Sequence, residues 1–528
     1  TLSWNLETKS GHNLNMLGGF TASRSKSNTL ALSGSGYMDD EVKWDNMGAV
    51  LDKETYSASS GSVKLTKISY LARINYNYKH RYYLTVTGRF DGASNFAANN
   101  KWGFFPSAAV KWNVSNEAFL KDVSWIDDLS LRLSAGRTGN DAISAYRSLA
   151  AMSSTTGGYL FSGSQPVAYY RSRLDSPNLT WEKTALYNVA LDVALFRNRL
   201  SVTAEGYISK THDLLMAIQT PTATGYSSRN ANLGKTTNKG WELSIESRNI
   251  VTPKFSWTTN LTFAHNEQTV NDIGSEEFVI ASKSPNTGYM MHGYVKGYPL
   301  NALWGFRYGG VWKSVEEFER NAVTHGYVSS GTITNYKNSL GLPRYYDIDH
   351  DGTLTQNDLV YLGNADPYLY GGLQNSIQIG RLNIGVYFTY SLGGKIYNWS
   401  ELYMAGSYST NQYRFMLDAW HPTRNPDSNL PRAGSVVVNV PSDLHVYDAS
   451  FLRLKNATIG YTFDLRKKTR LLRDIQLSVS GENLWLWKKY NGFDPDVSTE
   501  SGSSTMRRVD MGAYPKARTI VFSIQVRY

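Results

Sequence analysis

The stretch whose residue types and spacing most clearly suggest chemistry runs from Asp347 to Asp358. It reads Asp-x-Asp-x-Asp-Gly-x-x-x-x-x-Asp, close to the twelve-residue loop that binds calcium in helix–loop–helix proteins. In such loops alternate carboxylates supply side-chain oxygens, the seventh residue supplies its backbone carbonyl, and a glycine permits the sharp turn. The sequence therefore predicts a calcium site, with the candidate ligands Asp347, Asp349, Asp351, Thr353 and Asp358.

Two features separate this loop from the full calcium pattern. Asp358 stands where glutamate is usual, and its shorter side chain is a poorer bidentate ligand. The flanking helices of a helix–loop–helix unit are not evident either. The alternative is an Asp- and Gly-rich turn held by side-chain to backbone hydrogen bonds, without an ion. If calcium binds, its expected role is structural rather than catalytic.

The remaining residues offer little catalytic chemistry. The sequence has no Cys, which removes disulfides, thiolate metal ligands and a Cys nucleophile. It has no Gly-x-Ser-x-Gly segment, and its nine His include no His-x-x-x-His pair. The segment LGKTT at 233–237 resembles the end of a phosphate loop, but Arg229 stands where the first Gly should be. The sequence therefore argues against an enzyme.

The composition indicates an all-β protein. Among 528 residues there are 36 Tyr, 14 Trp and 44 Gly, while charged residues make up only 19%. This mixture suits pleated surfaces that are anchored at their edges by aromatic rings. The formal net charge of +10 would suit nucleic acid, but the basic residues are dispersed among short turns such as KHR at 79–81 and RNR at 197–199. No nucleic-acid partner is therefore expected.

Neither a transmembrane helix nor a signal peptide is predicted. No run of about 18 apolar residues occurs. The chain opens TLSWNLETKSG, without Met and already in an alternating pattern. We therefore expect a fragment of a longer protein, whose targeting segment belongs to the part that precedes residue 1.

Strand patterns with a period of two dominate the chain. In ALYNVALDVALF the odd positions from Tyr187 to Leu195 are all apolar or aromatic, and a second apolar set follows the RNR turn. We count about 17 such strands, many of roughly ten residues, with tight turns on one side and long polar connections on the other. Those lengths favour an outer-membrane barrel, because strands of a soluble sandwich, the alternative, average about 5–6 residues.

The C-terminal strand and the polar faces support the barrel. Glu242, Glu246 and Arg248 alternate with apolar residues, as the wall of a lumen would. The predicted fold class is an all-β, transmembrane antiparallel β-barrel with long extracellular loops. The final segment ARTIVFSIQVRY ends on an aromatic residue, which the barrel-assembly machinery is expected to read, and its apolar face carries Ile520, Phe522, Ile524, Val526 and Tyr528.

Counting strand crossings places the acidic loop. If the short turns are periplasmic, the strand over 255–263 ends at the outer face and the strand over 373–379 begins there. Residues 287–312 are predicted to add one further hairpin between these strands. Residues 313–366 are then one large extracellular excursion, and the calcium-type loop 347–358 lies within it.

The excursion carries structural signals of its own. Ser314 and Glu317 have the spacing of a capping box, which predicts a short helix. Millimolar external calcium can occupy even a weak oxygen site, so the acidic loop is expected to be stiffened by the ion.

Longer segments resemble the SusC/RagA group of TonB-dependent outer-membrane transporters of Bacteroidetes. The resemblance covers the chain nearly from end to end, and many ordered matches make it specific although each is weak alone. The matching segments include GRFDGASNFAANNKWGFFPSAAVKW, NLGKTTNKGWELSIES, VKGYPLNALWGFRYGGVW, DIDHDGTLTQNDLVYLGNADPYLYGG, GENLWLWKKYNGFDPDVS and YPKARTIVFSIQVRY.

This resemblance implies an architecture beyond the pattern. It implies a barrel of roughly 22 strands that is plugged by an N-terminal domain. A TonB-contacting segment would precede the plug, and a SusD-like surface lipoprotein would cap the barrel as a hinged lid. Residues 1–528 would be the C-terminal part of that barrel, without the plug and about five strands. The implied location is the outer membrane of a Gram-negative, Bacteroidetes-like cell, among outer-membrane lipid and lipopolysaccharide.

The ligand class stays open at this point. Glycan import is the commonest activity of the family, peptide import is the nearest alternative, and a surface adhesin or glycan-binding barrel without transport is a third hypothesis. Aromatic-rich stretches at 157–173 and 401–420 could stack on sugar rings, or they could be ordinary girdle and loop residues. No individual residue is predicted to contact an oligosaccharide or peptide ligand.

Overall fold

The computed structural model spans residues 1–528 and describes nearly all of them. Among the helices of the described residues, none is long and apolar enough to cross a membrane. The described part leaves out residues 38, 40, 42–44, 157–166, 227, 284–287, 330–338, 406–410, 435–439, 467–470 and 498–506, and the side chains of 219, 222 and 322.

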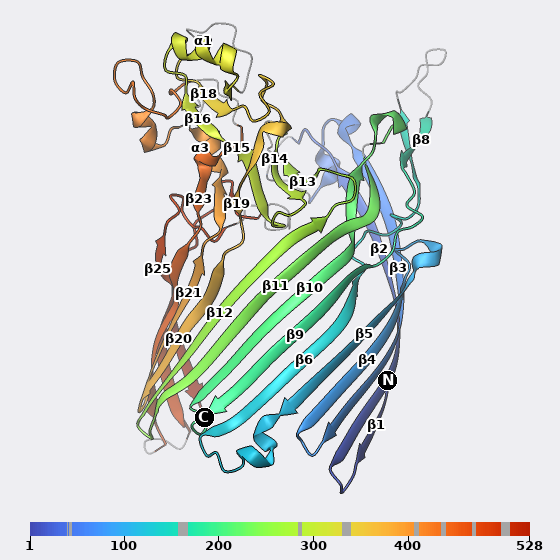
Figure 1. Ribbon diagram of the computed structural model, residues 1–528, viewed down its shortest axis with the longest axis vertical. Helices are drawn as coiled ribbons and strands as arrows, with labels where there is room; N and C mark the ends of the chain where they lie inside the picture. The colour runs from blue at the N-terminus through green and yellow to red at the C-terminus, as the bar shows by residue number, and fades with distance from the viewer. Residues whose placement is uncertain are drawn as a thin grey trace. The chain divides into compact units, whose positions relative to one another are not determined.

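Fifteen strands form one large sheet, in which neighbouring strands follow one another in chain order (Figure 1). The all-β prediction is confirmed, although the sheet has fifteen strands rather than about 17. The strands are β1 (Leu2–Glu7), β2 (His12–Ser33), β3 (Ser57–Tyr78), β4 (Tyr82–Ala93), β5 (Trp102–Asn113), β6 (Ile126–Asn140), β9 (Glu182–Leu195), β10 (Leu200–Gln219), β11 (Ser228–Val251), β12 (Phe255–Asp272), β20 (Leu369–Ile379), β21 (Leu382–Leu392), β24 (Phe451–Asp464), β25 (Asp474–Lys488) and β27 (Thr519–Arg527).

The other strands of the described residues form four small sheets. A four-stranded sheet contains β13 (Phe278–Lys283), β14 (Met290–Val295), β15 (Ala302–Phe306) and β19 (Leu359–Asn364). Two three-stranded sheets contain β16 (Tyr308–Val311), β18 (Pro343–Tyr346) and β17 (Tyr327–Val328), and β23 (Val446–Asp448), β22 (Lys395–Asn398) and β26 (Val509–Asp510). The last sheet pairs β7 (Ala151–Thr156) with β8 (Val167–Arg173).

The helices of the described residues are short. The α-helices are α1 (Val315–Thr324) and α3 (Trp399–Met404). The 3-10 helices are η1 (Met47–Ala49), η2 (Lys53–Thr55), η3 (Ala98–Asn100), η4 (Val114–Asn116), η5 (Ala118–Leu120), η6 (Thr222–Thr224), η7 (Gln356–Asp358), η8 (Arg414–Asp418) and η9 (Asp443–His445).

The chain divides into two compact units, and each is described by itself. Unit 1 comprises Thr1–Lys111, Ser134–Tyr187 and Thr211–Gly234, and unit 2 comprises Trp112–Leu133, Asn188–Lys210 and Lys235–Tyr528. In unit 1, β2 and β3 pair antiparallel along their whole lengths, and β3 pairs with β4 through the predicted KHR turn. Lys79 and His80 adopt left-handed φ angles of 51° and 54° in this turn.

In unit 2 the strands β12 and β20 pair directly and antiparallel, from Phe255↔Ile379 to Ala264↔Tyr370. The further hairpin predicted over 287–312 is therefore wrong as a part of the large sheet, because its strands β14 and β15 belong to the four-stranded sheet. A hairpin adds two crossings, so its removal leaves the acidic loop at the same end of β12. Figure 1 shows the small sheets of unit 2 beyond that end, away from the 380–381 turn.

The small sheets of unit 2 have their own buried core. We call β13–β19, β22, β23, β26, α1 and α3, together with the short helices η7, η8 and η9, the loop assembly. Phe306 and Tyr397 are fully buried in it, and Trp312 is 1% exposed. Burial of this kind stabilises a fold by about 1.5–3 kcal/mol for each large side chain. The loop assembly is thus a packed structure rather than a set of open loops.

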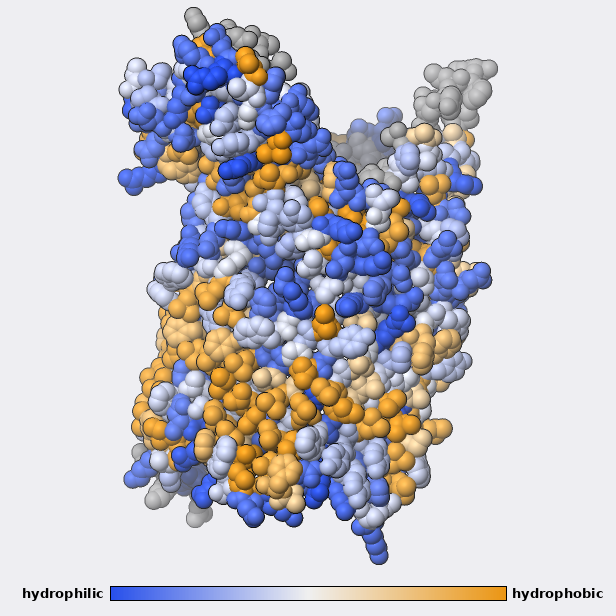
Figure 2. All heavy atoms as spheres, in the orientation of Figure 1, coloured by the Kyte–Doolittle hydropathy of each residue, from blue (hydrophilic) through white to orange (hydrophobic). Residues whose placement is uncertain are grey.

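The apolar face of the large sheet is, by contrast, exposed. On β27 the side chains of Ile520, Phe522 and Ile524 are 62%, 77% and 73% exposed. The opposite face also lacks a covering layer in unit 2, since the side chains of Glu246 and Arg248 on β11 are about half exposed. A sandwich would bury the apolar face, whereas a membrane barrel turns it toward lipid. Figure 2 shows hydrophobic residues gathered over the lower parts of β12 and β20.

Aromatic rings form a belt on the exposed face of unit 1. The ring of Tyr70 lies 5.3 Å from Phe20 and 6.3 Å from Trp102, which stacks on Phe90 at 4.8 Å. Tyr78 lies eight residues further along β3, or about 26 Å along the strand at about 3.3 Å per residue. Allowing for strand tilt, this spacing is comparable to the apolar band of an outer-membrane barrel, about 25 Å tall.

Candidate functional site

The acidic loop 347–358 joins two sheets of the loop assembly. It begins after β18, in a three-stranded sheet, and ends at β19, in the four-stranded sheet. Gly352 takes a φ of +79°, which glycine adopts without steric cost, as the calcium pattern requires at this position. His350 also has a left-handed φ, and its Nδ1 lies 2.9 Å from the carbonyl oxygen of His325 at the end of α1.

Three of the predicted ligands converge. Asp347, Asp349 and Asp351 each offer a carboxylate oxygen, and these oxygens lie within 4.8 Å of one another. Oxygens bound to one calcium ion at about 2.3–2.6 Å are separated by at most about 5 Å, so the spacing fits this ion. Among the described residues, no Lys or Arg forms an ion pair with these three carboxylates. The loop therefore concentrates negative charge at one point.

Asp347 is the buried member of this group. Its side chain is only 2% exposed, and Oδ2 accepts a hydrogen bond from the Gly352 N–H at 2.8 Å. Oδ1 is buried and has no hydrogen-bond partner among the described residues. An ionised oxygen in that position is costly unless a cation satisfies it.

Asp349 and Asp351 are exposed and are oriented by the loop itself. The carboxylate of Asp349 accepts from the Asp351 N–H at 3.3 Å and from Asn357 Nδ2 at 3.1 Å. Asp351 Oδ1 accepts from the hydroxyl and the N–H of Thr353, both at 2.7 Å. These two bonds lower the pKa of Asp351, which keeps the carboxylate ionised at neutral pH.

Asp358 has a different environment from the other predicted ligands. It is fully buried, its Oδ1 accepts from the Ile348 N–H and its Oδ2 from the Thr355 N–H, both at 2.8 Å. The group of three converging carboxylates does not include it. Thr355 and Asp358 instead form a capping box on η7. The spacing Thr-x-x-Asp is the sequence signal for this arrangement, and the prediction of a calcium ligand overlooked it.

The helix predicted from Ser314 is present as α1. The Ser314 hydroxyl oxygen accepts from the Glu317 N–H at 3.2 Å, as in a capping box. The Glu317 carboxylate, however, accepts from the Lys313 N–H at 3.1 Å and pairs with Arg344 at 3.3 Å. Glu317 thereby ties α1 to β18, the strand that precedes the acidic loop.

The polar face of the large sheet in unit 2 is a network of paired groups. Arg132 on β6 pairs with Asp192 on β9 at 2.6 Å, and Asp192 also accepts from the Thr203 hydroxyl of β10 at 3.0 Å. The Tyr207 hydroxyl donates to Asn266 at 2.8 Å across β10 and β12. Such ladders suit a water-lined wall, and they set up no nucleophile beside a base.

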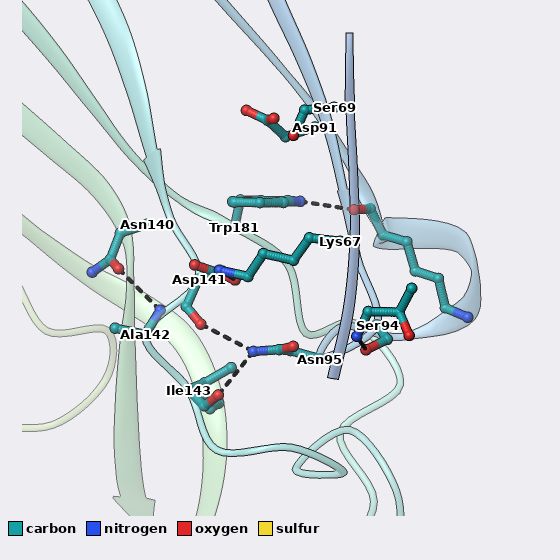
Figure 3. Close-up of polar contacts among 12 residues, drawn as sticks. Lys67, Ser69, Asp91, Ser94, Asn95, Asn140, Asp141, Ala142, Ile143 and Trp181 are labelled. Carbon is teal, nitrogen blue, oxygen red and sulfur yellow. Dashed lines mark hydrogen bonds and ion pairs between the residues drawn. The ribbon is translucent and has the colours of Figure 1, made fainter. Parts of the chain in front are cut away.

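A second polar cluster lies in unit 1 beside the GRFDGASNF segment (Figure 3). Lys67 on β3 pairs with Asp141 at 2.6 Å. Asn95, which is 3% exposed, donates through Nδ2 to the carbonyls of Asp141 and Ile143 at 3.2 and 3.0 Å. Trp181 packs in the adjacent apolar cluster with Phe96 and Phe105. These contacts hold two loops against one core, which is a structural role.

The aromatic-rich stretches are described only in part. Residues 157–166 and 406–410 lie outside the described residues. Within the rest, Tyr169 on β8 is 75% exposed, while Phe415 lines a pocket in unit 2.

Residues 2–355 match the family model described as TonB dependent receptor-like, beta-barrel. The TonB-dependent receptor P3 of Formosa agariphila is 32% identical over 98% of this chain and 51% of its own length. The TonB-dependent receptor SusC of Bacteroides thetaiotaomicron is 30% identical over 90% of this chain and 45% of its own length.

A solved structure shares the fold. The structure of the RagAB peptide transporter superposes with a TM-score of 0.80 at 22% identity, covering 99% of this chain and 54% of that chain. The likeness at this identity concerns the fold alone. The chain spans about half the length of the relatives that it matches.

Proposed function

This chain belongs to the TonB-dependent receptor-like β-barrel family, within its SusC/RagA group, and from this premise we propose that it forms the barrel of an importer of nutrient oligomers in the outer membrane. The observation that carries the proposal is the family match over residues 2–355, together with an exposed apolar face on the large sheet. Energy for import would come from TonB, through parts of the longer relatives that this chain does not match.

We propose oligosaccharides as the first class of cargo and peptides as the alternative. The family's commonest activity supports the first class. The likeness to a transporter described as a peptide importer supports the second. A surface adhesin without transport would share the barrel, and uptake that depends on TonB separates it from an importer.

A SusD-like lipoprotein is the proposed lid over the loop assembly. The loop assembly is large, with elements between residues 278 and 364 and between 395 and 448 of unit 2 together with β26, and it has its own core. Because this surface is already ordered, less conformational entropy is lost when a partner binds to it. The predicted extracellular excursion 313–366 overlaps this assembly from residue 313 to residue 364, and the acidic loop joins two of its sheets.

Calcium is the proposed clamp of that junction. Asp347, Asp349 and Asp351 would bind the ion through side-chain oxygens, with the Thr353 carbonyl as a further ligand. The buried Oδ1 of Asp347, which has no hydrogen-bond partner among the residues that the structure describes, supports this proposal. Asp358 would hold the ends of the loop together by its two backbone hydrogen bonds, whether or not it also reaches the ion.

Import is tested in cells that carry the complete gene and a candidate SusD-like partner. Uptake of labelled malto-oligosaccharides and of mixed peptides would be measured with and without TonB. The proposal expects saturable uptake that is lost without TonB, and it expects the lipoprotein to copurify in mild detergent. Deletion of residues 345–360 should weaken that copurification. Binding without TonB-dependent uptake would support the adhesin instead.

The calcium clamp is tested by calorimetry on the purified protein. We expect one weak site, in the range of about 10⁻⁴–10⁻³ M that is usual for external sites, and its loss in Asp347→Asn and Asp349→Asn. Asp427→Asn, at an exposed carboxylate outside the group, is the matched control. Unchanged calcium binding in Asp347→Asn would contradict the assignment. Asp358→Asn should instead loosen the loop even in a chelator, as seen by limited proteolysis.

A further inference from the structure

A pocket of about 270 Å³ lies inside the loop assembly of unit 2. Its walls come from β16, β18, α3, η8, η9 and β23 and from the loop residues Ala405, Leu430, Pro431 and Asn491, segments that are far apart in the sequence. Four aromatic rings line it, those of Tyr308, Tyr345, Phe415 and Tyr447, and most of the remaining lining consists of Leu, Met, Pro and Ala. Pockets for whole drug-sized ligands measure about 300–1,000 Å³, so this one suits a single ring of a longer molecule.

The charged group of the pocket is already satisfied by the protein. Glu401 is 3% exposed, and its Oε1 accepts from His445 Nδ1 at 3.1 Å and from the Tyr447 hydroxyl at 2.6 Å. Its Oε2 accepts from the side-chain amides of Asn491 at 2.8 Å and Asn398 at 3.2 Å. Burial raises the pKa of Glu401, but the bonds from His445 and Tyr447 outweigh it and lower the pKa overall. The carboxylate is therefore ionised and has four donors.

Two polar groups of the lining remain available to a ligand. An ionised carboxylate cannot donate, so a proton of His445 must lie on Nδ1, and Nε2 is the ring nitrogen left for a ligand. Neither Nε2 nor the Tyr345 hydroxyl has a hydrogen-bond partner among the described residues. By contrast, the Tyr308 hydroxyl donates to the Asn429 carbonyl at 2.6 Å. Among the described residues, the pocket thus combines apolar walls with one free imidazole nitrogen and one free hydroxyl.

We infer that this pocket binds one aromatic side chain of a peptide, tyrosine or phenylalanine, as an anchor. The inference rests on the proposed function and selects its peptide alternative for this site. Four rings and aliphatic walls match an aromatic ring in shape and polarity. Tyr345 and His445 can hydrogen-bond a phenol at its tip.

Other ligand chemistries fit the lining less well. A buried sugar ring presents several hydroxyls, and each one left without a partner costs about 1–3 kcal/mol, while the pocket has only two free polar groups. Anionic groups such as sulfate need a cation, and no Lys or Arg is among the lining residues. A Lys or Arg side chain would need a free carboxylate, but Glu401 is saturated.

The test measures binding of capped pentapeptides Gly-Gly-X-Gly-Gly to the full protein in detergent, with X as Tyr, Phe, Ala or Lys. We expect Tyr and Phe to bind roughly ten- to hundredfold more tightly than Ala, from burial of one aromatic side chain. Ala405→Phe, which fills the pocket from its rim, should remove that advantage. Ala150→Phe, at an exposed alanine outside the lining, is the matched control.

A second variant tests the polar tip without disturbing the packing. Tyr345→Phe keeps the ring, so it should retain phenylalanine binding and reduce the preference for tyrosine several-fold, whereas Tyr361→Phe on β19 should not. Equal affinity for Ala and Phe peptides in the wild type, or an unchanged advantage in Ala405→Phe, would overturn the inference. Stronger binding of maltotetraose, abolished by Ala405→Phe, would assign the pocket to a glycan.

The uptake assay separates this inference from the proposed function. If peptide uptake depends on TonB but shows no preference for aromatic residues in either the wild type or Ala405→Phe, only the pocket assignment is wrong. Pocket-dependent peptide binding without any TonB-dependent uptake would instead count against the importer.

Discussion

The large sheet and the loop assembly use apolar side chains in opposite ways. On β27, Phe522 and Ile524 are 77% and 73% exposed on one face of a single layer. In the loop assembly, Phe306 and Tyr397 are fully buried between short strands. The sheet is therefore specified by its surroundings, lipid on one side and water on the other, whereas the loop assembly is specified by its own core. The acidic loop and the aromatic pocket both belong to the second region.

The largest expected difference is between a buried ion pair close to the loops and an exposed ion pair on the large sheet. Arg453 and Asp494 pair at 2.6 Å with both side chains only 4% exposed, where β24 reaches the loops. Lys239 and Glu267 pair at 3.0 Å across β11 and β12 with side chains 58% and 46% exposed. We expect Asp494→Ala to cost about 3–5 kcal/mol of unfolding free energy, because it leaves a buried guanidinium unpaired. Glu267→Ala should cost at most about 1 kcal/mol.

Urea unfolding in detergent micelles, followed by tryptophan fluorescence, measures both losses. Arg453→Met combined with Asp494→Leu is the control, because removing both charges together restores much of the stability that the single change removes. Equal costs for Asp494→Ala and Glu267→Ala would mean that the Arg453–Asp494 pair, at the end of β24 that meets the loops, is as well hydrated as the sheet surface.

A charge on each face of β27 tests the sheet itself. Ile524→Arg places a guanidinium on the apolar face and is expected to cost about 2–4 kcal/mol if the residue lies near the middle of the bilayer. Gln525→Arg places the same group on the opposite face, where water solvates it, so its cost should be small. Folding yield into lipid vesicles, read by the heat-dependent mobility of barrels on gels, compares the two. Equal yields would contradict a lipid-facing apolar side.

The sequence correctly predicted the structure of regions in which a single rule, such as the alternation of side chains along a strand, applies to every residue. Alternation from Ile520 to Val526 predicted both the strand β27 and its apolar face, because side chains point to opposite faces at every step. It failed at 287–312, where β14 is buried on both faces and period two cannot tell which sheet a short strand joins. Spacing singled out Asp347, Asp349 and Asp351, whose carboxylate oxygens converge, but it gave no account of the hydrogen bonds made by Asp358.

The aromatic pocket could not have been predicted from spacing. Tyr308, Tyr345, Glu401, His445 and Asn491 lie in five separate segments, and only the packing of the loop assembly brings them together. Local sequence rules act over a few residues, so they reach helix caps and strand faces. They do not reach a site whose parts are more than one hundred residues apart, from Tyr308 to Asn491.

The smallest expected effect is the pH dependence of stability that comes from a buried histidine of the loop assembly. His292 on β14 is 2% exposed; its Nε2 donates to the Arg507 carbonyl at 3.0 Å, and Nδ1 lies 3.1 Å from the Ser282 hydroxyl. A carbonyl only accepts, so a proton of the ring lies on Nε2. Burial lowers the pKa of His292 to about 4, against 6.5 for the ordinary side chain.

The sign of the pH effect follows from these two values. Above pH 6.5 the ring is neutral in both the folded and the unfolded chain, so His292 contributes no pH dependence. Between pH 6.5 and about 4 only the unfolded chain takes up the proton, and the free energy of unfolding falls by about 1.4 kcal/mol per pH unit. From pH 7.5 to 5.5 the loop assembly should thus lose about 1.4 kcal/mol through this residue. Hydrogen exchange of β14 and β15 measures that loss, which His292→Gln should reduce and His80→Gln, in the exposed 79–81 turn, should not. If the loss is the same in His292→Gln as in the wild type, the buried ring is not the source of the acid sensitivity. The core of the loop assembly would then be hydrated around His292, as the surface of the large sheet is.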